Sequence, residues 1–218
     1  KAVWHYILDH PFYHHDSLKV PLKNMNVICL DEMHKKFVDE TYPHINSCIV
    51  LPLAAKQAES GLKPYDMRDN DLIFTESYTD PDMVYFKAKK QDSENVYFFN
   101  TFTQILFDNP ELTQEEAIRK IYPGISGTQT AEKLQQNFMA DVYIQAAIGQ
   151  EIVVQLIRNH VPVKLYGHNW DTFLTKAEVL MKEDLTFIKE HVKDCGEVMY
   201  GELPKIYNNA RLSINQLP

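Results

Sequence analysis

The densest run of chemically active side chains directly follows the first apolar segment of the chain. The run is residues 9–16 (DHPFYHHD), and the apolar segment is residues 2–8 (AVWHYIL). A carboxylate at a strand end, beside a histidine whose ordinary pKa is about 6.5, can take a proton from a hydroxyl nucleophile. We therefore predict an acid–base role for Asp9 and His10. A solvated turn, in which Asp9 caps backbone groups before Pro11, is an equally open alternative.

The same run contains three histidines and two aspartates, which are metal ligands by residue type. Closed structural zinc sites usually add cysteines or a spaced second pair of ligands, and Cys29 and Cys48 do not obviously supply one. We predict that the chain holds no metal ion.

Three later turns carry groups that suit a phosphorylated or planar ligand. Residues 74–81 (FTESYTDP) run into a helix start, where free backbone N–H groups and hydroxyls bind anions. Residues 166–170 (YGHNW) combine a glycine, which permits close approach, with aromatic, amide and imidazole groups. Residues 196–204 (GEVMYGELP) leave backbone groups free to bind the edge of a base. Each has an ordinary alternative: a helix cap at Thr79 or Asp80, a core or lid aromatic at Trp170, and a plain strand-to-helix turn.

These turns need elements to position them, and the hydrophobic pattern predicts an α/β fold. Short β-branched runs at 2–8, 27–30 and 48–53 indicate buried strands, and residues 31–42 have helical spacing. A strand, helix and strand in this order form a βαβ unit, whose parallel strands place their following loops at one edge of the sheet. A new strand is expected at 71–75.

The rest of the chain is predicted to be helical and then α/β again. We expect a helical stretch from about 82 to 107, either continuous or broken. A capping box at Thr113 is expected to open a helix to Tyr122, and one long helix is expected from Ser126 to about Asn159. Strands are predicted at 161–166, 198–200 and 212–214, with a short helix at 204–210. The polar segment 56–70 is the predicted domain boundary.

Composition narrows the function classes. The chain has 218 residues, 44% of them hydrophobic, and a net charge of −8, which suits a soluble globular protein and disfavours nucleic-acid binding. No apolar stretch approaches the ~20 residues of a membrane-spanning helix. Three widely spaced cysteines favour a reducing compartment, so we predict a cytoplasmic location. Because Lys1 is not methionine and both ends lie close to strand-like runs, we expect a longer parent protein.

Taken together, the series of segments resembles the middle of a GT-B-fold glycosyltransferase of the bacterial spore-maturation type. The matching segments are residues 8–11 (LDHP), 50–55 (VLPLAA), 74–78 (FTESY), 165–170 (LYGHNW) and 200–215 (YGELPKIYNNARLSIN). The resemblance implies two Rossmann-like lobes facing across a cleft. Residues 1–60 are expected to form part of the N-terminal lobe, 61–70 a linker, and 71–218 a C-terminal lobe with a helical insert.

The resemblance also implies a hexosyltransferase-like activity. A sugar would pass from a nucleotide-diphosphate sugar to an acceptor hydroxyl of a glycan, protein or small molecule, without a cofactor or metal. Asp9, with His10 beside it, would act on the acceptor, and hydrogen-bond donors would stabilise the departing diphosphate. The donor-binding residues expected from the matching segments are Ser77, Tyr78, Gly167, His168, Trp170, Gly201, Leu203, Tyr207 and Asn215.

The competing hypothesis is a truncated or degenerate glycosyltransferase-like module that binds a partner or a nucleotide without turnover. Glu76 favours this reading, because the family usually has glycine at that position of the turn and a carboxylate there repels a diphosphate. The family's ribose-binding acidic segment would follow Asn215, beyond the end of the chain. The sequence does not indicate the oligomeric state.

Overall fold

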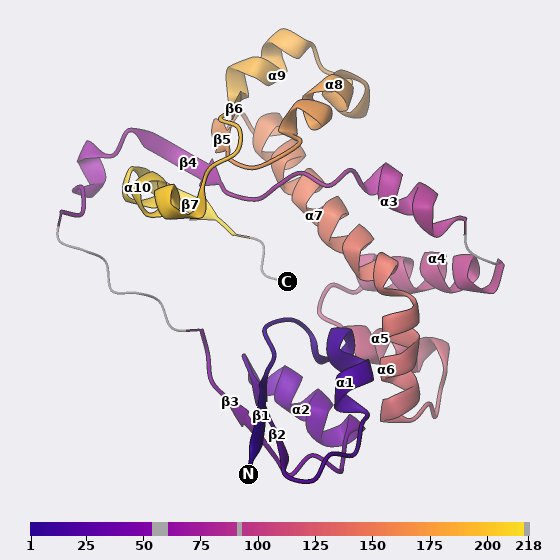
Figure 1. The fold of residues 1–218 in the computed structure, drawn as a ribbon. Coiled ribbons are helices and arrows are strands. Elements are labelled where there is room, and N and C mark those ends of the chain that lie inside the picture. Colours follow the sequence, from indigo (N-terminus) through magenta and orange to yellow (C-terminus); the bar gives the residue numbers. More distant parts are fainter. Residues whose placement is uncertain (54–60, 91–92, 216–218) are drawn as a thin grey trace. The chain divides into compact units, whose positions relative to one another are not determined.

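The computed structural model describes residues 1–53, 61–90 and 93–215, and these form two compact units (Figure 1). The first unit contains residues 1–53 together with most of 88–141, and the second contains 61–87 and 142–215. Part of the predicted exit segment 50–55, namely Ala54 and Ala55, and the 56–60 part of the predicted boundary lie outside the described residues.

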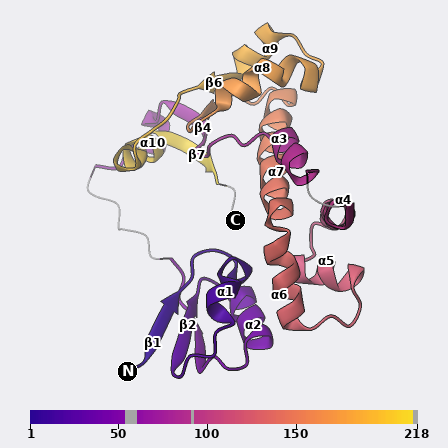
Figure 2. The ribbon, with the colours of Figure 1, turned by 45° about the vertical axis from the view of Figure 1, so that its right-hand side comes forward.

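A three-stranded parallel sheet lies at the centre of the first unit. Its strands are β1 (Val3–Tyr6), β2 (Met25–Cys29) and β3 (Ser47–Val50), in the order β1-β2-β3. The turns η1 (Pro11–His14) and α1 (His15–Leu18) connect β1 to β2, and α2 (Glu32–Thr41) connects β2 to β3. The predicted βαβ unit is therefore confirmed, and Figure 2 shows α1 and α2 on one face of this sheet.

Three helices follow in the first unit, and two of them begin at capping residues predicted from the sequence. They are α4 (Ser93–Asp108), α5 (Gln114–Ile121) and α6 (Gly127–Gln136). Complete capping boxes join Thr113 to Glu116 and Ser126 to Gln129, which confirms both predicted helix starts.

The single long helix predicted from Ser126 to Asn159 is wrong. The structure has two helices, because α6 ends at Gln136 and α7 (Phe138–Arg158) begins after Asn137. The backbone of Asn137 leaves the helical region, and its side-chain amide donates to the Lys133 carbonyl at 2.9 Å. An asparagine side chain that bonds the preceding turn competes with continued helix, which explains the break.

The helical segment from residue 88 to 141 packs with the first unit, whereas the sequence assigned it as an insert in the second lobe. Where α6 begins, a Cβ on Gly127 would lie 3.0 Å from the Glu40 carbonyl oxygen and 3.1 Å from Thr41, so α6 approaches the end of α2 closely. Arg119 of α5 also pairs with Glu40 at 3.1 Å. Ile118 of α5 and Ala131 of α6 are fully buried, and the close approach and the ion pair join these two helices to α2.

The second unit is built on four parallel strands. They are β4 (Asn70–Phe74), β5 (Val163–Leu165), β6 (Val192–Asp194) and β7 (Ala210–Ile214), in the order β6-β5-β4-β7. Around them lie α3 (Pro81–Ala88), most of α7, α8 (Trp170–Met181), α9 (Leu185–His191), α10 (Leu203–Asn208), η2 (Tyr65–Met67) and η3 (Tyr200–Glu202). This is the winding of a Rossmann-like half, in which successive strands add to one side and the last returns to the other.

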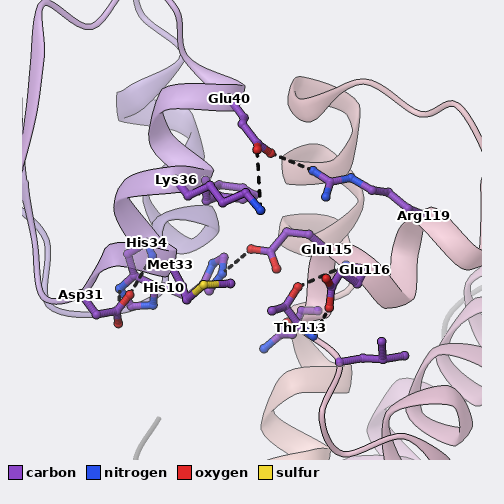
Figure 3. A pocket seen from close by; sticks show the side chains of 13 residues that line it. His10, Asp31, Met33, His34, Lys36, Glu40, Thr113, Glu115, Glu116 and Arg119 are labelled. Atoms are coloured by element: carbon purple, nitrogen blue, oxygen red, sulfur yellow. Dashed lines mark hydrogen bonds and ion pairs between the residues drawn. The ribbon is translucent and has the colours of Figure 1, made fainter.

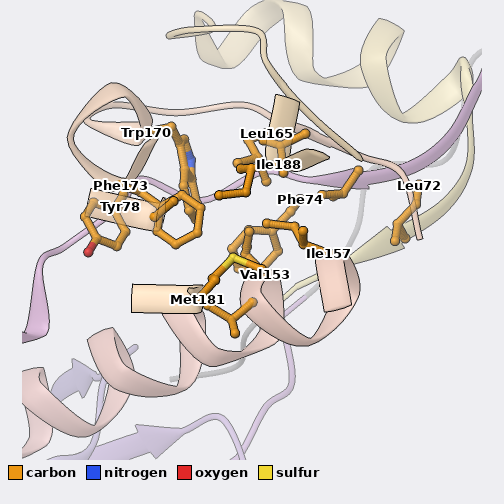
Figure 4. Close-up of a cluster of buried hydrophobic side chains, with 14 residues drawn as sticks. Leu72, Phe74, Tyr78, Val153, Ile157, Leu165, Trp170, Phe173, Met181 and Ile188 are labelled. Carbon is orange, nitrogen blue, oxygen red and sulfur yellow. The ribbon is translucent and has the colours of Figure 1, made fainter. Parts of the chain in front are cut away.

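The core of the second unit lies between the sheet and the helices α7, α8 and α9 (Figure 4). Phe74 and Leu165 from the strands meet Val153 and Ile157 of α7 and Phe173 of α8 in one buried cluster. Parallel sheets are stable when helices bury the apolar side chains on their faces, and this cluster supplies such burial for the second sheet.

Two predictions for the end of the chain need correction. The strand predicted at 198–200 is absent: β6 comes earlier, and η3 begins at Tyr200. The chain leaves β6 because Gly196 has φ +73° and its N–H donates to the Asp194 carboxylate at 2.9 Å. The sequence analysis also missed α8 and α9, although buried Phe173, Ala177 and Met181 recur every fourth residue, which is helical spacing.

Among the described residues, no helix combines the length and apolar character required to cross a bilayer.

Candidate functional site

The parallel strands of the second unit all end at one edge of their sheet, which we call the second carboxyl edge. β4 is flanked by β5 on one side and β7 on the other, so the direction of winding reverses at β4. In open α/β sheets, ligands bind outside the carboxyl ends of the strands where this reversal occurs. The topology therefore predicts a ligand site at the turns after β4, β5 and β7.

The turns after β4 and β5 are joined by four hydrogen bonds, the longest of which runs from the Asn169 side-chain amide to the Tyr78 carbonyl at 3.4 Å. The Tyr78 N–H donates to the His168 carbonyl at 2.8 Å, and the His168 N–H donates to Ser77 Oγ at 3.0 Å. The indole N–H of Trp170 donates to the Glu76 carbonyl at 2.7 Å. Four of the predicted donor-binding residues (Ser77, Tyr78, His168 and Trp170) thus belong to one pair of turns.

Gly167 makes this pairing possible. Its φ is +144°, and a Cβ at this position would lie 2.5 Å from the Glu76 carbonyl oxygen and 2.8 Å from the Ser77 nitrogen. The close approach expected at this glycine is therefore an approach to the neighbouring turn of the same chain. Only a residue without a side chain fits there.

Two of the predicted ligand-binding aromatics are structural. Trp170 is 1% exposed and Tyr78 is 3% exposed, and their rings pack with centroids 5.3 Å apart. The Tyr78 hydroxyl donates to Gln150 Oε1 at 2.7 Å, and burial raises the pKa of Tyr78. The side chains of Trp170 and Tyr78 are therefore part of the core beneath the two turns, whereas Ser77 and His168 are exposed to solvent.

The helix start after β4 is already occupied by the chain's own carboxylate. α3 begins at Pro81, and Asp80 Oδ1 accepts the Asp82 N–H at 3.0 Å. Lys176 neutralises both carboxylates, at 2.6 Å from Asp80 and 3.0 Å from Asp82. The helix-cap alternative is therefore confirmed for Asp80. By contrast, α8 begins after Asn169 without a side-chain cap. The Thr172 N–H donates to the Asn169 carbonyl at 3.0 Å, so within the described residues the N–H groups of Trp170 and Asp171 are those left at the start of α8.

Tyr207 and Asn215 lie together at the side of the edge where β4 and β7 end. The Tyr207 hydroxyl is 2.6 Å from Thr75 Oγ1 and 3.4 Å from Asn215 Oδ1. Leu203 is the first residue of α10, and exposed Gly201 lies in η3 just before it. Within the described residues, no hydrogen bond or ion pair joins Gly201 or Leu203 to Ser77 or His168.

The first unit has its own carboxyl edge, beside which lies a cavity of about 230 Å³ (Figure 3). Its lining comes from the segment after β1, from α2 and from α5. The lining residues are His10, Asp31, Met33, His34, Lys36, Phe37, Glu40, Leu112, Thr113, Gln114, Glu115, Glu116 and Arg119. We call it the first-unit cavity. Asp9 precedes His10 on the chain and is exposed.

Both ring nitrogens of His10 are engaged within the protein. Nδ1 accepts the Phe12 N–H at 3.2 Å and so caps η1, and Nε2 lies 2.8 Å from Glu115 Oε1. An Nδ1 that accepts a hydrogen bond requires the ring proton to be on Nε2, which then donates to Glu115. Neither ring nitrogen of His10 is therefore free in this structure.

Sequence reasoning missed Glu115, the partner of His10. This carboxylate is 9% exposed. Burial alone would raise its pKa, but hydrogen bonds from His10 and at the start of α5 lower the pKa from 4.5 to about 2. The two residues are 105 positions apart in the sequence, and no short motif connects them.

No group of three or more His, Cys, Asp or Glu side chains within the described residues is arranged to hold a metal ion.

No protein family, curated protein or solved structure matches the chain. The two carboxyl edges are therefore the features of the molecule that bear on its function.

Proposed function

We propose that the chain belongs to a glycosyltransferase that moves a sugar from a nucleotide-diphosphate sugar to an acceptor hydroxyl. The observation that carries the proposal is the second carboxyl edge. There, four parallel strands wind with a reversal at β4, and the turns after β4 and β5 are held together by the close approach at Gly167. This is the arrangement in which α/β proteins bind nucleotides.

The diphosphate of the donor would bind at the turns after β4 and β5. Ser77 Oγ accepts the His168 N–H, and its own O–H can still donate to a phosphate oxygen. The uncapped first turn of α8 adds backbone N–H groups and the positive end of the helix dipole. These donors would stabilise the negative charge that develops on the departing diphosphate.

The nucleoside would bind toward the ends of β5 and β7. His168 is exposed there, and Tyr207 and Asn215 present a hydroxyl and an amide beside Thr75. Gly201 and Leu203 are proposed to contribute backbone groups, as the family resemblance implies. No metal ion or cofactor is part of the proposed reaction, in which the acceptor oxygen bonds to the anomeric carbon as the bond to the diphosphate breaks.

A reducing, cytoplasmic location is part of the proposal. All three cysteines are free thiols, and the Sγ atoms of Cys29 and Cys48 lie 3.5 Å apart on adjacent strands. Burial raises the pKa of both thiols and keeps them protonated, so they behave as small apolar side chains.

Nucleotide titration of the full-length protein tests the donor site. Uridine, guanosine, adenosine and thymidine diphosphates are titrated by calorimetry, and we expect one of them to bind. Tyr207→Phe removes the hydroxyl beside Thr75 and should weaken that binding about fivefold, as loss of one hydrogen bond does. Tyr200→Phe is the matched control, because Tyr200 is 90% exposed. Failure of all four nucleotides to bind would contradict the proposal.

The second candidate function is a nucleotide- or partner-binding module without turnover. Glu76 favours it, since a carboxylate in the turn after β4 lies beside the proposed diphosphate site. The two functions are separated by assaying donor hydrolysis once the bound nucleotide is known. Nucleotide binding without hydrolysis of the matching nucleotide sugar, in the full-length protein, would select the module.

A further inference from the structure

The first-unit cavity contains a second histidine, His34, which the acid–base prediction did not include. His34 lies in the first turn of α2, three residues after the helix cap Asp31. Its backbone N–H donates to Asp31 Oδ1 at 2.8 Å, and its ring Nδ1 lies 3.5 Å from Asp31 Oδ2. Figure 3 shows Asp31, His34 and His10 grouped on one side of the cavity. The Asp31 carboxylate thus accepts a hydrogen bond from the His34 backbone and lies near the ring Nδ1 without a hydrogen bond to it.

The His34 ring differs from the His10 ring in what its nitrogens bind. His10 uses Nδ1 as a helix cap and Nε2 as a donor to Glu115. In His34, Nδ1 is buried and faces only the Asp31 carboxylate, and within the described residues no protein group bonds Nε2. A carboxylate near Nδ1 favours the tautomer with the proton on Nδ1, which leaves the Nε2 lone pair available.

The groups around the ring keep it unprotonated near neutral pH. Burial lowers the pKa of His34 from 6.5, and the neighbouring His10 ring lowers it further. Asp31, Glu115 and Asp9 act in the opposite direction but do not outweigh burial. A neutral imidazole with a carboxylate behind one nitrogen and a free second nitrogen is the arrangement of a general base and its orienting group.

The charges of the cavity indicate which ligands it accepts. Glu40 pairs with Arg119 at 3.1 Å and lies 4.0 Å from Lys36, so the two cations at the rim share one carboxylate. Asp31, Glu115 and Glu116 add further negative charge to the lining. Met33, Phe37 and Leu112 contribute apolar surface. This combination favours an uncharged hydroxyl compound over a phosphate or carboxylate.

We propose that His34 Nε2 is the proton acceptor for the acceptor hydroxyl bound in the first-unit cavity, with Asp31 as the positioning residue. The inference rests on the proposed sugar transfer. The acceptor O–H proton passes to Nε2, the acceptor oxygen bonds to the anomeric carbon, and the electron pair of the broken bond leaves with the diphosphate. The proton is then released to solvent. Asp9 and His10, the residues predicted from the sequence, have other roles under this proposal.

The test begins with the state of the ring. Two-dimensional ¹H–¹⁵N spectra of the imidazoles in the full-length protein should show His34 as the Nδ1–H tautomer and His10 as the Nε2–H tautomer. Diethylpyrocarbonate, which modifies free neutral imidazole nitrogens, should label His34 and spare His10. The exposed His160 is the positive control for labelling. A His34 ring protonated on Nε2 would overturn the proposal.

The second measurement is the pH profile of donor hydrolysis, with water as the acceptor and the nucleotide sugar whose nucleotide binds. His34→Gln should lower kcat at least about 100-fold, the lower end of general-base catalysis, and remove the acidic limb of the profile. Asp31→Asn keeps a helix cap but removes the negative charge near the His34 ring. It should therefore lower kcat less than His34→Gln does and shift the acidic limb of the pH profile. His44→Gln is the matched control, because its ring bonds the Leu18 carbonyl away from the cavity lining.

The outcomes separate the inference from the proposed function. Nucleotide binding with hydrolysis and pH profile unchanged in His34→Gln would overturn the inference and leave the glycosyltransferase intact. Loss of the acidic limb in Asp9→Asn but not in His34→Gln would return the role of proton acceptor to Asp9. Absence of nucleotide binding in the wild-type protein would remove the proposed function and the inference with it.

Discussion

At the scale of single residues, histidines of the first unit differ in role because their ring nitrogens have different partners. His10 is tied to Phe12 and Glu115, whereas His34 keeps one ring nitrogen free. His15 is fully buried, with Nδ1 2.9 Å from the Tyr42 hydroxyl. Residue type alone therefore does not identify a proton acceptor. A histidine can accept a proton only where one of its ring nitrogens has no hydrogen-bond partner within the protein.

Gly167 provides a stability prediction at the same scale. Gly167→Ala places a Cβ 2.5 Å from the Glu76 carbonyl oxygen on a backbone with φ +144°, so the turns after β4 and β5 must separate. We expect a loss of several kcal/mol in the free energy of unfolding, typical of steric strain combined with lost hydrogen bonds. Urea denaturation in a Trp4→Phe background measures it, because the fluorescence then reports Trp170, which is buried in the second unit.

Gly201→Ala is the control for that prediction. Nothing lies within 4 Å of a Cβ at Gly201, and its φ lies outside the strained positive range. Its stability should therefore change by less than about 0.5 kcal/mol, or rise slightly. Equal effects of the two substitutions would show that the close approach at Gly167 contributes nothing.

At the scale of elements, helix caps determine where the cavity-lining helices begin. Asp31 opens α2 and Thr113 opens α5, and both residues line the first-unit cavity. The cap at Thr113 places Glu115 in the first turn of α5, from which it reaches His10. The helix cap at Thr113 thus positions the Glu115 side chain, which bonds His10, a residue 105 positions away in the sequence.

The capping box of α5 supplies the prediction at this scale. Thr113→Ala leaves the Glu116 N–H without its side-chain acceptor, which lies at 3.3 Å. The expected loss is about 1 kcal/mol in the free energy of unfolding of the first unit, measured by urea denaturation with hydrogen exchange. Glu116→Gln is the control, because glutamine completes the same box. Equal losses in the two variants would contradict the capping explanation.

At the scale of the whole molecule, the chain builds two compact α/β units and passes between them more than once. Residues 88–141 return to the first unit after β4 and α3, and the remainder of the chain completes the second. Each sheet is entirely parallel, so each unit presents its own carboxyl edge. Three histidines whose pKa is lowered by burial lie in the first unit.

Mild acid should destabilise the first unit more than the second. Burial lowers the pKa of His14, His15 and His34 from 6.5, so the unfolded chain takes up protons first as the pH falls. Their contribution is complete above pH 6.5 and is lost progressively below it. In the second unit, the lowered carboxyls Asp69 and Asp184 respond only near or below 3.8.

Hydrogen exchange with mass spectrometry, corrected for intrinsic rates, measures this difference between pH 7 and pH 5. Peptides from β2 and α2 should lose protection, and peptides from β5 and α8 should keep it. His15→Gln removes one of the buried titrating groups and should reduce the pH dependence of the first unit. Equal loss of protection in both units, unaffected by His15→Gln, would contradict the assignment.

The part of the structure that the sequence predicts is local. The strands near 2–8, 27–30, 48–53 and 71–75, the helix at 31–42 and both capping boxes were predictable. Each depends on residues a few positions apart, through side-chain periodicity or one side-chain-to-backbone hydrogen bond. The α8 spacing was also present in the sequence but was not recognised.

Only the tertiary structure decided the break at Asn137, the return of residues 88–141 to the first unit, and the pairing of His10 with Glu115. It also showed that Trp170 and Tyr78 are buried supports, while His34 keeps a free ring nitrogen. These properties depend on contacts between distant segments, whose formation is governed by how whole apolar faces pack. Local patterns therefore determined the elements of this protein, and packing determined which side chains remain available for chemistry.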